Sequence, residues 1–205
     1  GYFKSELSLP IIHATRISDL ATARYAIKEN LLDLVGMTRA HIADPHLVKK
    51  MLEGKENRIR PCVGAGYCID RIYGEGEMLC LHNVATTREK TVPHLITKAK
   101  KRFKTIVVGG GPAGLEASRV CAERGHEVVL LEAAAELGGQ VKIASMASIR
   151  KDLIGIVSWL EAEIKHLKVD IRTQCFADIG YIKKENPDVV IHITKSIFMP
   201  WTNRR

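Results

Sequence analysis

Three cysteines close together in the sequence are the residues most able to bind a metal centre. Cys62, Cys68 and Cys80 lie within a stretch of nineteen residues. Structural zinc sites usually pair cysteines about two to four residues apart, and five residues separate Cys62 from Cys68. The spacing therefore favours an iron–sulfur cluster, which ordinarily takes four protein ligands. The alternative is three unrelated buried thiols, since a free cysteine often behaves as a small hydrophobic residue.

The other two cysteines carry no such pattern. Cys121 falls in the middle of a predicted helix and Cys175 stands alone, so we interpret both as core or incidental residues. An odd number of cysteines without a signal-peptide pattern indicates a reducing compartment, which we take to be the cytoplasm.

A glycine turn between an apolar strand and a helix forms a second candidate site. Gly109, Gly111 and Gly114 have the G-x-G-x-x-G spacing of dinucleotide-binding folds. The first glycine permits a tight turn, the second lets the backbone approach a pyrophosphate, and the third lets the helix pack closely on the sheet. Glu132 ends the next strand, where its carboxylate would bind ribose hydroxyls. This context favours dinucleotide or ADP binding over a structural turn of similar sequence.

A second glycine pair follows Glu132. Gly139 belongs to the stretch ELGGQ, which resembles the second glycine pair of two-dinucleotide flavoproteins. This favours FAD over NAD in this domain.

Strands and helices that alternate along the chain must position these residues. In the first part we predict a strand over 9–14, a helix capped by Ser18 or Asp19, a strand over 31–38, and a helix that begins at Pro45 after an Asp44 cap. Residues 57–102 show no clear periodicity, so we expect a bound metal centre to organise them. From Lys104 the pattern is strand, glycine turn, helix ended by Gly125, and strand, followed by a helix over 150–167 and strands over 169–173 and 187–193. Such alternation predicts parallel sheets.

Composition excludes several functional classes. The 205 residues are 46% hydrophobic and 26% charged, as in ordinary soluble globular proteins. No apolar run approaches the roughly 20 residues that a membrane-spanning helix needs. The net charge is +8, but the one dense basic run, Thr97–Lys104, is interpreted as a solvated linker. We therefore expect neither a nucleic acid nor a membrane as partner.

The order of the motifs resembles one family of oxidoreductases. The segments DLVGMTRAHIADP, IRPCVGAGYC, TIVVGGGPAGLEA and VVLLEAAAELGGQ resemble the trimethylamine dehydrogenase and 2,4-dienoyl-CoA reductase group, and its N-methylproline demethylase-like branch in particular. These old-yellow-enzyme-like NADH:flavin oxidoreductases combine an FMN-binding barrel, a [4Fe–4S] segment and a nucleotide-binding region. The resemblance implies an α/β fold in three parts. These are the last two βα units of a TIM-type (β/α)8 barrel in 1–56, an iron–sulfur segment in 57–102, and an incomplete FAD/NAD(P)-type domain in 103–205.

The resemblance also implies an FMN site. Arg39 matches the arginine that binds the FMN phosphate in the family, and the loops after barrel strands 7 and 8 are the usual phosphate site of this fold. Backbone groups from Ala14 to Arg16, and at Met37 and Thr38, would complete the phosphate cradle. Without the resemblance, Arg39 would be interpreted as a solvated arginine at a strand end.

The cysteine segment departs from the family at one position. Ala65 stands where the family has its second cluster cysteine, and alanine cannot bind iron. His82, two residues after Cys80, is a possible substitute. Three outcomes stay open: a [4Fe–4S] cluster with a non-cysteine fourth ligand, a [3Fe–4S] cluster, or a site that has lost its cluster.

The resemblance implies a chain truncated at both ends. Barrel strands 1 to 6 would precede Gly1, so the catalytic residues stay unknown, and a leader could also be missing because the chain lacks an initial methionine. After residue 192 the family continues into an Ala-Thr-Gly turn beside the flavin, whereas this chain keeps Thr194 between Ile193 and Lys195.

The implied function belongs to the parent protein. It would oxidise or demethylate a small amine, or reduce an activated alkene, through FMN, with electrons passing through the cluster to or from a nucleotide-bound domain or an electron-transfer partner. That domain would hold FAD, which communicates with NAD(P)H, or ADP, and an oligomer is possible. The competing hypothesis is a catalytically inactive nucleotide-binding remnant. An ordinary NAD dehydrogenase fragment is disfavoured by the cysteines.

Overall fold

The computed structural model of the chain describes residues 2–193. The backbone divides into two compact units, Gly1–His94 and Leu95–Arg205, which we describe separately. The boundary between the units divides the cysteine segment expected over 57–102. Residues 57–94 belong to the first unit and residues 95–102 to the second. The departure from the family at Thr194 and Lys195 lies outside the described residues.

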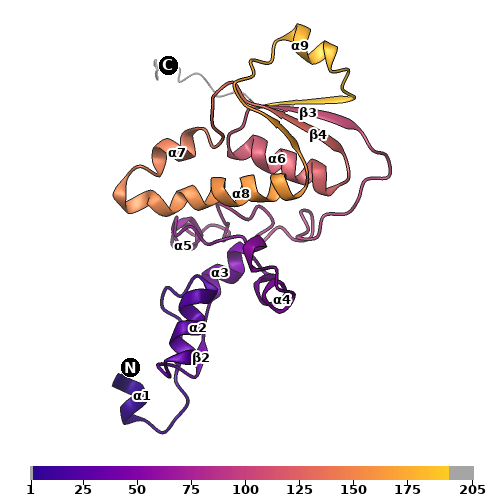
Figure 1. Cartoon of the computed structure of the whole chain (residues 1–205). Coiled ribbons are helices and arrows are strands. Elements are labelled where there is room, and N and C mark those ends of the chain that lie inside the picture. Colours follow the sequence, from indigo (N-terminus) through magenta and orange to yellow (C-terminus); the bar gives the residue numbers. More distant parts are fainter. Residues whose placement is uncertain (1, 194–205) are drawn as a thin grey trace. The chain divides into compact units, whose positions relative to one another are not determined.

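The first unit consists mainly of short helices, with α2 beside β2 of a short parallel strand pair (Figure 1). Its elements are α1 (Tyr2–Glu6), β1 (Ile12–His13), α2 (Leu20–Lys28), β2 (Leu34–Val35), α3 (Thr38–Ala43), α4 (Leu47–Leu52), the 3-10 helix η1 (Glu56–Arg58) and α5 (Tyr67–Tyr73). β1 pairs with β2 in parallel, with Ile12 opposite Leu34. The predicted strand–helix–strand order and parallel pairing are therefore confirmed for this part.

The start of α2 shows why the chain turns into a helix there. The Asp19 Oδ1 atom accepts a hydrogen bond from the backbone N–H of Thr22 at 2.8 Å, which satisfies one of the unpaired donors of the first turn. The Thr22 hydroxyl donates to Asp19 Oδ2 at 2.9 Å. Of the two predicted caps, Ser18 and Asp19, the structure uses Asp19.

Three predicted elements of the first unit have different bounds in the structure. The strand predicted over 9–14 covers only Ile12–His13, and the strand predicted over 31–38 covers only Leu34–Val35, with Thr38 instead beginning α3. The helix expected from Pro45 begins at Leu47, after a turn in which the His46 amide donates to Asp44 Oδ1 at 3.0 Å. The helix α5 was missed, because its N-cap is Gly66 at φ +74°, with no capping side chain to mark the start.

The second unit is a four-stranded parallel sheet with helices on both faces. Its elements are β3 (Lys104–Val108), α6 (Pro112–Glu123), β4 (Glu127–Leu131), α7 (Gln140–Ala144), the 3-10 helix η2 (Ser148–Leu153), α8 (Ile154–His166), β5 (Asp170–Arg172), α9 (Ile179–Lys184) and β6 (Val189–His192). The strand order is β5-β4-β3-β6. β4 and then β5 therefore lie on one side of β3, and β6 lies on its other side. The predicted strands are confirmed, but the helix expected from residue 150 begins at Ile154, after a 3-10 turn.

The sheet separates two apolar layers, with α6 and α8 on one face and α9 on the other (Figure 1). On the α9 face, Ile106, Val129 and Leu131 form a buried cluster against Tyr181 and Ile182. Cys175 packs against the same cluster, as expected for a core thiol. Gly125 follows α6 at φ +96°, a left-handed conformation that favours glycine after a helix end.

None of the helices within residues 2–193 has the length and apolar content needed to cross a membrane.

Candidate functional site

The three clustered cysteines line one pocket in the first unit. Cys62 lies in the loop after η1, Cys68 in the first turn of α5, and Cys80 in the loop after that helix. The enclosed part of the pocket is small, about 30 Å³, and the rest of it is open to solvent. Segments separated by up to eighteen positions therefore present their thiols to a common space. Ala65 and His82 line the same pocket.

The arrangement of the thiols differs from that of a single-ion site. Within residues 2–193, no three His, Cys, Asp or Glu side chains are grouped closely enough to hold one metal ion. Around one zinc ion, all ligands must approach the same atom at roughly 2.0–2.3 Å. In an iron–sulfur cluster the cysteines bind different iron atoms, so their sulfur atoms can stand farther apart. Cys62, Cys68 and Cys80 therefore line one pocket without closing around a single point.

Cys121 behaves differently from these three residues. It lies on α6 in the second unit, where burial raises the pKa of its thiol. A thiol that stays protonated is a poor metal ligand, because the thiolate is the form that binds metals. Its interpretation as a core residue agrees with this position.

Arg39 lines the cysteine pocket rather than lying free on the surface. It is half-buried in the first turn of α3, directly after Thr38. The predicted phosphate arginine and the three cysteines therefore belong to one region of the first unit.

The other predicted phosphate residues gather at the carboxyl ends of β1 and β2. Gly36 N donates to His13 O at 2.8 Å, and a Cβ atom added to Gly36 would lie 2.7 Å from that of Ala14. The segments that begin at Ala14 and Met37 are thus neighbours, as expected for loops after adjacent parallel strands. Arg16, at φ +55°, and Thr38 are exposed, so both are accessible to a ligand.

The glycine turn of the second unit follows β3 at the point where the strand order reverses. In open parallel sheets, ligands bind outside the carboxyl ends of the strands at such a point. Gly109 has φ +110°, and a Cβ atom there would lie 2.2 Å from the Ile193 carbonyl oxygen. A Cβ atom at Gly114 would lie 1.8 Å from the Gly109 carbonyl oxygen. Both positions need glycine for the fold itself.

Gly111 is different because nothing lies within 4 Å of the place where its Cβ would be. It is the N-cap of α6, and Pro112 occupies the first turn. The N-terminus of this twelve-residue helix carries unpaired N–H groups and a partial positive charge, which favour a phosphate group. The fold does not need glycine here, but a ligand that approaches the backbone would.

Glu132 and the second glycine pair complete the turn. The Glu132 carboxylate accepts hydrogen bonds from Gly110 N at 2.6 Å and from Ala134 N at 2.7 Å. Gly138 N donates to Gly110 O at 2.8 Å. Gly139, at φ +50°, would bring a Cβ atom within 3.3 Å of the Gly111 Cα. The two glycine-rich segments and the acidic strand end are thus neighbours in the structure, although Gly109 and Gly139 are 30 positions apart in the sequence.

Comparison with known proteins agrees with this geometry. Residues 107–180 match the family described as NAD(P)-binding Rossmann-like domain. Over 194 residues the chain is 50% identical to a probable N-methylproline demethylase of Rhizobium meliloti, covering 95% of this chain and 29% of that protein. It is also 50% identical over 192 residues to a multifunctional alkene reductase/demethylase of Caballeronia cordobensis, covering 94% of this chain and 28% of that protein.

A solved structure of 2-naphthoyl-CoA reductase resembles the chain with a TM-score of 0.87 and 31% identity, covering 93% of this chain and 29% of that one. The second unit is therefore a Rossmann-like NAD(P)-binding domain in an α/β protein with parallel sheets. The chain belongs to the group of oxidoreductases that includes these demethylases and reductases, which confirms the resemblance indicated by the motifs. It spans under a third of the length of the relatives it matches.

Sequence reasoning missed the polar residues that support the cysteine loop. Asp44 was interpreted as a helix cap and Asn83 was not singled out, yet both are buried beside this loop. Their partners lie about sixteen and forty-one positions away in the sequence, so no local pattern could reveal them.

Proposed function

We propose that the chain is part of a flavin-dependent oxidoreductase that oxidises or demethylates a small amine, or reduces an activated alkene. In this proposal an iron–sulfur cluster carries electrons between FMN and the Rossmann-like domain. The observation that carries the proposal is the convergence of Cys62, Cys68 and Cys80 on one pocket. It is supported by the 50% identity to a protein named as a demethylase and reductase.

The residues of the pocket fit a cluster held by three thiolates. A bound cluster would supply one-electron transfer, with a potential set in part by its ligands and its exposure to solvent. Cys62, Cys68 and Cys80 would bind three iron atoms, and Ala65 offers no fourth ligand.

His82 is the candidate for the fourth position. Its Nδ1 atom lies 3.1 Å from the Pro61 carbonyl oxygen, which can only accept, so Nδ1 is the donor in this contact. Histidines that bind metals usually donate their other ring N–H to such a carbonyl. A [3Fe–4S] cluster without a fourth ligand is the alternative.

The first unit would be the end of the FMN-binding barrel. Ile12 and Leu34, on the paired strands, are 67% and 54% exposed. Parallel strands in α/β proteins are ordinarily covered on both faces, so these strands fit a larger sheet. Arg39 and the segments at Ala14–Arg16 and Met37–Thr38 would hold the FMN phosphate.

The Rossmann-like domain would bind FAD or ADP. Gly111 and the N-terminus of α6 would face the pyrophosphate, while Gly109 and Gly114 shape the turn. Glu132 would accept hydrogen bonds from the ribose, and Gly139 supports the turn from the second glycine segment. NAD(P)H would then act as electron donor or acceptor for the flavin.

The test is anaerobic reconstitution of the chain with iron and sulfide, followed by metal analysis and electron paramagnetic resonance. Wild type should bind iron and sulfide with a cluster spectrum, and Cys62→Ser, Cys68→Ser and Cys80→Ser should each reduce it strongly. Cys121→Ser is the matched control and should leave the cluster unchanged. Absence of iron in wild type, or equal loss in the control, would contradict the proposal.

The second candidate is a nucleotide-binding remnant without electron transfer. The observation that favours it is Ala65, which removes one thiol from the pocket. This function predicts that ADP binds the chain while no cluster assembles. The reconstitution experiment, combined with calorimetry for ADP, therefore separates the two candidates.

A further inference from the structure

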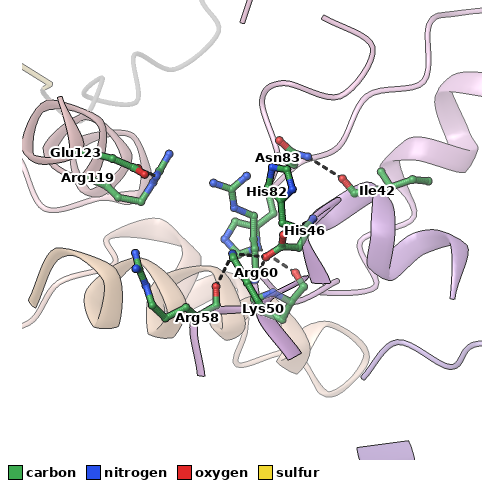
Figure 2. A network of polar contacts seen from close by, with 11 residues as sticks. Ile42, His46, Lys50, Arg58, Arg60, His82, Asn83, Arg119 and Glu123 are labelled. Carbon is green, nitrogen blue, oxygen red and sulfur yellow. Dashed lines mark hydrogen bonds and ion pairs between the residues drawn. The ribbon is translucent and has the colours of Figure 1, made fainter. Parts of the chain in front are cut away.

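We propose that the chain's own polar contacts hold the cysteine loop in place before any cluster binds, with Asp44 and Asn83 as the positioning residues. The inference rests on the proposed function, because it concerns how the cluster site is built. It replaces the expectation that a metal centre organises this segment. Figure 2 shows part of the network of polar contacts involved.

Asp44 holds the chain just before Cys62. Its side chain is buried at the end of α3, where the residue is 3% exposed. The Oδ2 atom accepts hydrogen bonds from Arg60 N at 2.8 Å and from Lys50 Nζ at 2.6 Å. Lys50 Nζ also donates to Arg58 O at 2.8 Å, a contact visible in Figure 2. The ion pair between the half-buried Lys50 and the buried Asp44 thus binds two backbone groups of the segment that leads into Cys62.

Asn83 holds the chain just after Cys80. It is 2% exposed, and its Nδ2 atom donates to the Ile42 carbonyl oxygen at 2.8 Å (Figure 2). Its Oδ1 atom accepts from Ala85 N at 3.2 Å. The Thr86 hydroxyl lies 3.4 Å from the same carbonyl of Ile42. Since Ile42 and Asp44 both belong to the end of α3, one helix end anchors both sides of the cysteine loop.

A third contact joins the two ends of the loop directly. The His82 ring, 6% exposed, donates from Nδ1 to Pro61 O at 3.1 Å. Pro61 precedes Cys62 and His82 follows Cys80 by two residues, so this bond closes the segment that carries all three thiols. The loop is therefore tied at its base by protein groups alone.

Asp44 and Asn83 are themselves buried, so breaking either contact leaves a buried polar group without that partner, which costs free energy. Removal of Asn83 leaves the Ile42 carbonyl without its amide donor, and removal of Asp44 leaves the half-buried Lys50 ammonium without its carboxylate. Either change frees one end of the loop. The thiols would then keep their chemistry but lose their relative positions.

The first experiment measures the wild-type 205-residue chain with and without the cluster. Amide hydrogen exchange is followed in peptides that contain Arg60 and Ala85, whose N–H groups donate to Asp44 and Asn83. We expect equal protection of these amides in the metal-free protein and in the reconstituted protein. Protection that appears only with bound cluster would overturn the proposal, because the metal would then organise the loop.

The second experiment measures iron release to a chelator from reconstituted Asp44→Ala and Asn83→Ala. Loss of groups that orient metal ligands typically weakens binding roughly 10- to 100-fold, so we expect release to be faster by a similar factor. The paramagnetic spectrum of the remaining cluster should broaden, a change that a general loss of stability would not produce. Glu53→Gln is the matched control, because Glu53 is an exposed acid directly after α4.

The outcomes separate this inference from the proposed function. Unchanged iron release in both variants overturns the positioning role while the cluster itself stands. If wild type binds no iron, the proposed electron-transfer function fails. The exchange measurement on the metal-free chain still decides whether the polar contacts of Asp44 and Asn83 hold the cysteine loop in place. Exchange protection of amides in α2, which belongs to the same unit but not to the cysteine loop, serves as the folding control for both variants.

Discussion

The fold does not require glycine at position 111, whereas a ligand that approaches the backbone there would. A side chain at Gly109 or Gly114 would collide with backbone oxygen atoms of the protein, whereas a side chain at Gly111 would point into open space. Glycine is therefore needed at Gly109 and Gly114 for packing within the protein, and at Gly111 for the approach of a ligand. The sequence already predicts that the second glycine faces the ligand, and the structure adds that the fold itself leaves open space at Gly111.

We expect Gly111→Val to keep the fold and to weaken ADP or FAD binding by roughly 100-fold, or about 2.7 kcal/mol, because the side chain blocks backbone approach to the pyrophosphate. Calorimetry on the purified chain measures the affinity, and circular dichroism checks the fold. Gly114→Ala is the contrasting variant, and it should destabilise the domain instead. An unchanged affinity in Gly111→Val would exclude this turn from the nucleotide site.

A cysteine introduced at Ala65 would show whether the proposed cluster lacks a fourth ligand. It is exposed in the pocket that the three cysteines line, so a thiol at this position can reach the same space. We expect Ala65→Cys to slow the loss of iron in air by about tenfold, since four cysteines are the usual ligand set. Iron content over time, with the paramagnetic spectrum, is the measurement.

Equal stability of wild type and Ala65→Cys would mean that another residue already completes the cluster. His82→Ala would then lose iron faster than wild type. Iron binding only in Ala65→Cys would mean that the natural site no longer holds a cluster.

At the scale of elements, α2 shows how directly a sequence signal can determine a helix start. Asp19 was one of two predicted caps, and its side chain binds the Thr22 amide. We expect Asp19→Ala to reduce the free energy of unfolding of the first unit by about 1 kcal/mol. Urea denaturation followed by circular dichroism measures this, with Ser18→Ala as control. A larger loss in the Ser18 variant would contradict the assignment of the cap.

The elements that could be predicted are those with local signals. The apolar strands β3 and β4 and the glycine turn between them follow from composition and spacing, and so does the cap of α2. The start of α4 could not be predicted, because Asp44 binds the distant amide of Arg60 and the Lys50 ammonium as well as the neighbouring His46 amide. The helix α5 was missed because Gly66 gives no capping side chain. The contacts of Asp44 with Arg60 and Lys50 are long-range and leave no periodic pattern in the sequence, whereas the start of α5 lacks even a local signal.

At the scale of the whole molecule, the chain corresponds to under a third of its relatives. If the first unit is the end of an FMN-binding barrel, as proposed, the purified 205-residue chain should show no NADH oxidation when FMN is added, because two strands of such a barrel cannot enclose a flavin. Absorbance at the NADH band, with and without FMN, is the measurement. Saturable turnover that disappears in Arg39→Ala would contradict this expectation and would place a working flavin site in the first unit.

The position of β6 beside β3 has a consequence for the synthesis of the protein. Lys104 N donates to Asp188 Oδ2 at 2.8 Å across a separation of 84 residues, and Ile193 N donates to Val108 O at 2.9 Å. Ribosomes add about 5–20 residues per second, so β3 waits on the order of 4–17 s for its last neighbour. During this interval one side of β3 is an open edge that can pair with another nascent chain. The glycine turn, which is backed by the Ile193 carbonyl, would thus be among the last parts of the domain to become ordered as the chain leaves the ribosome.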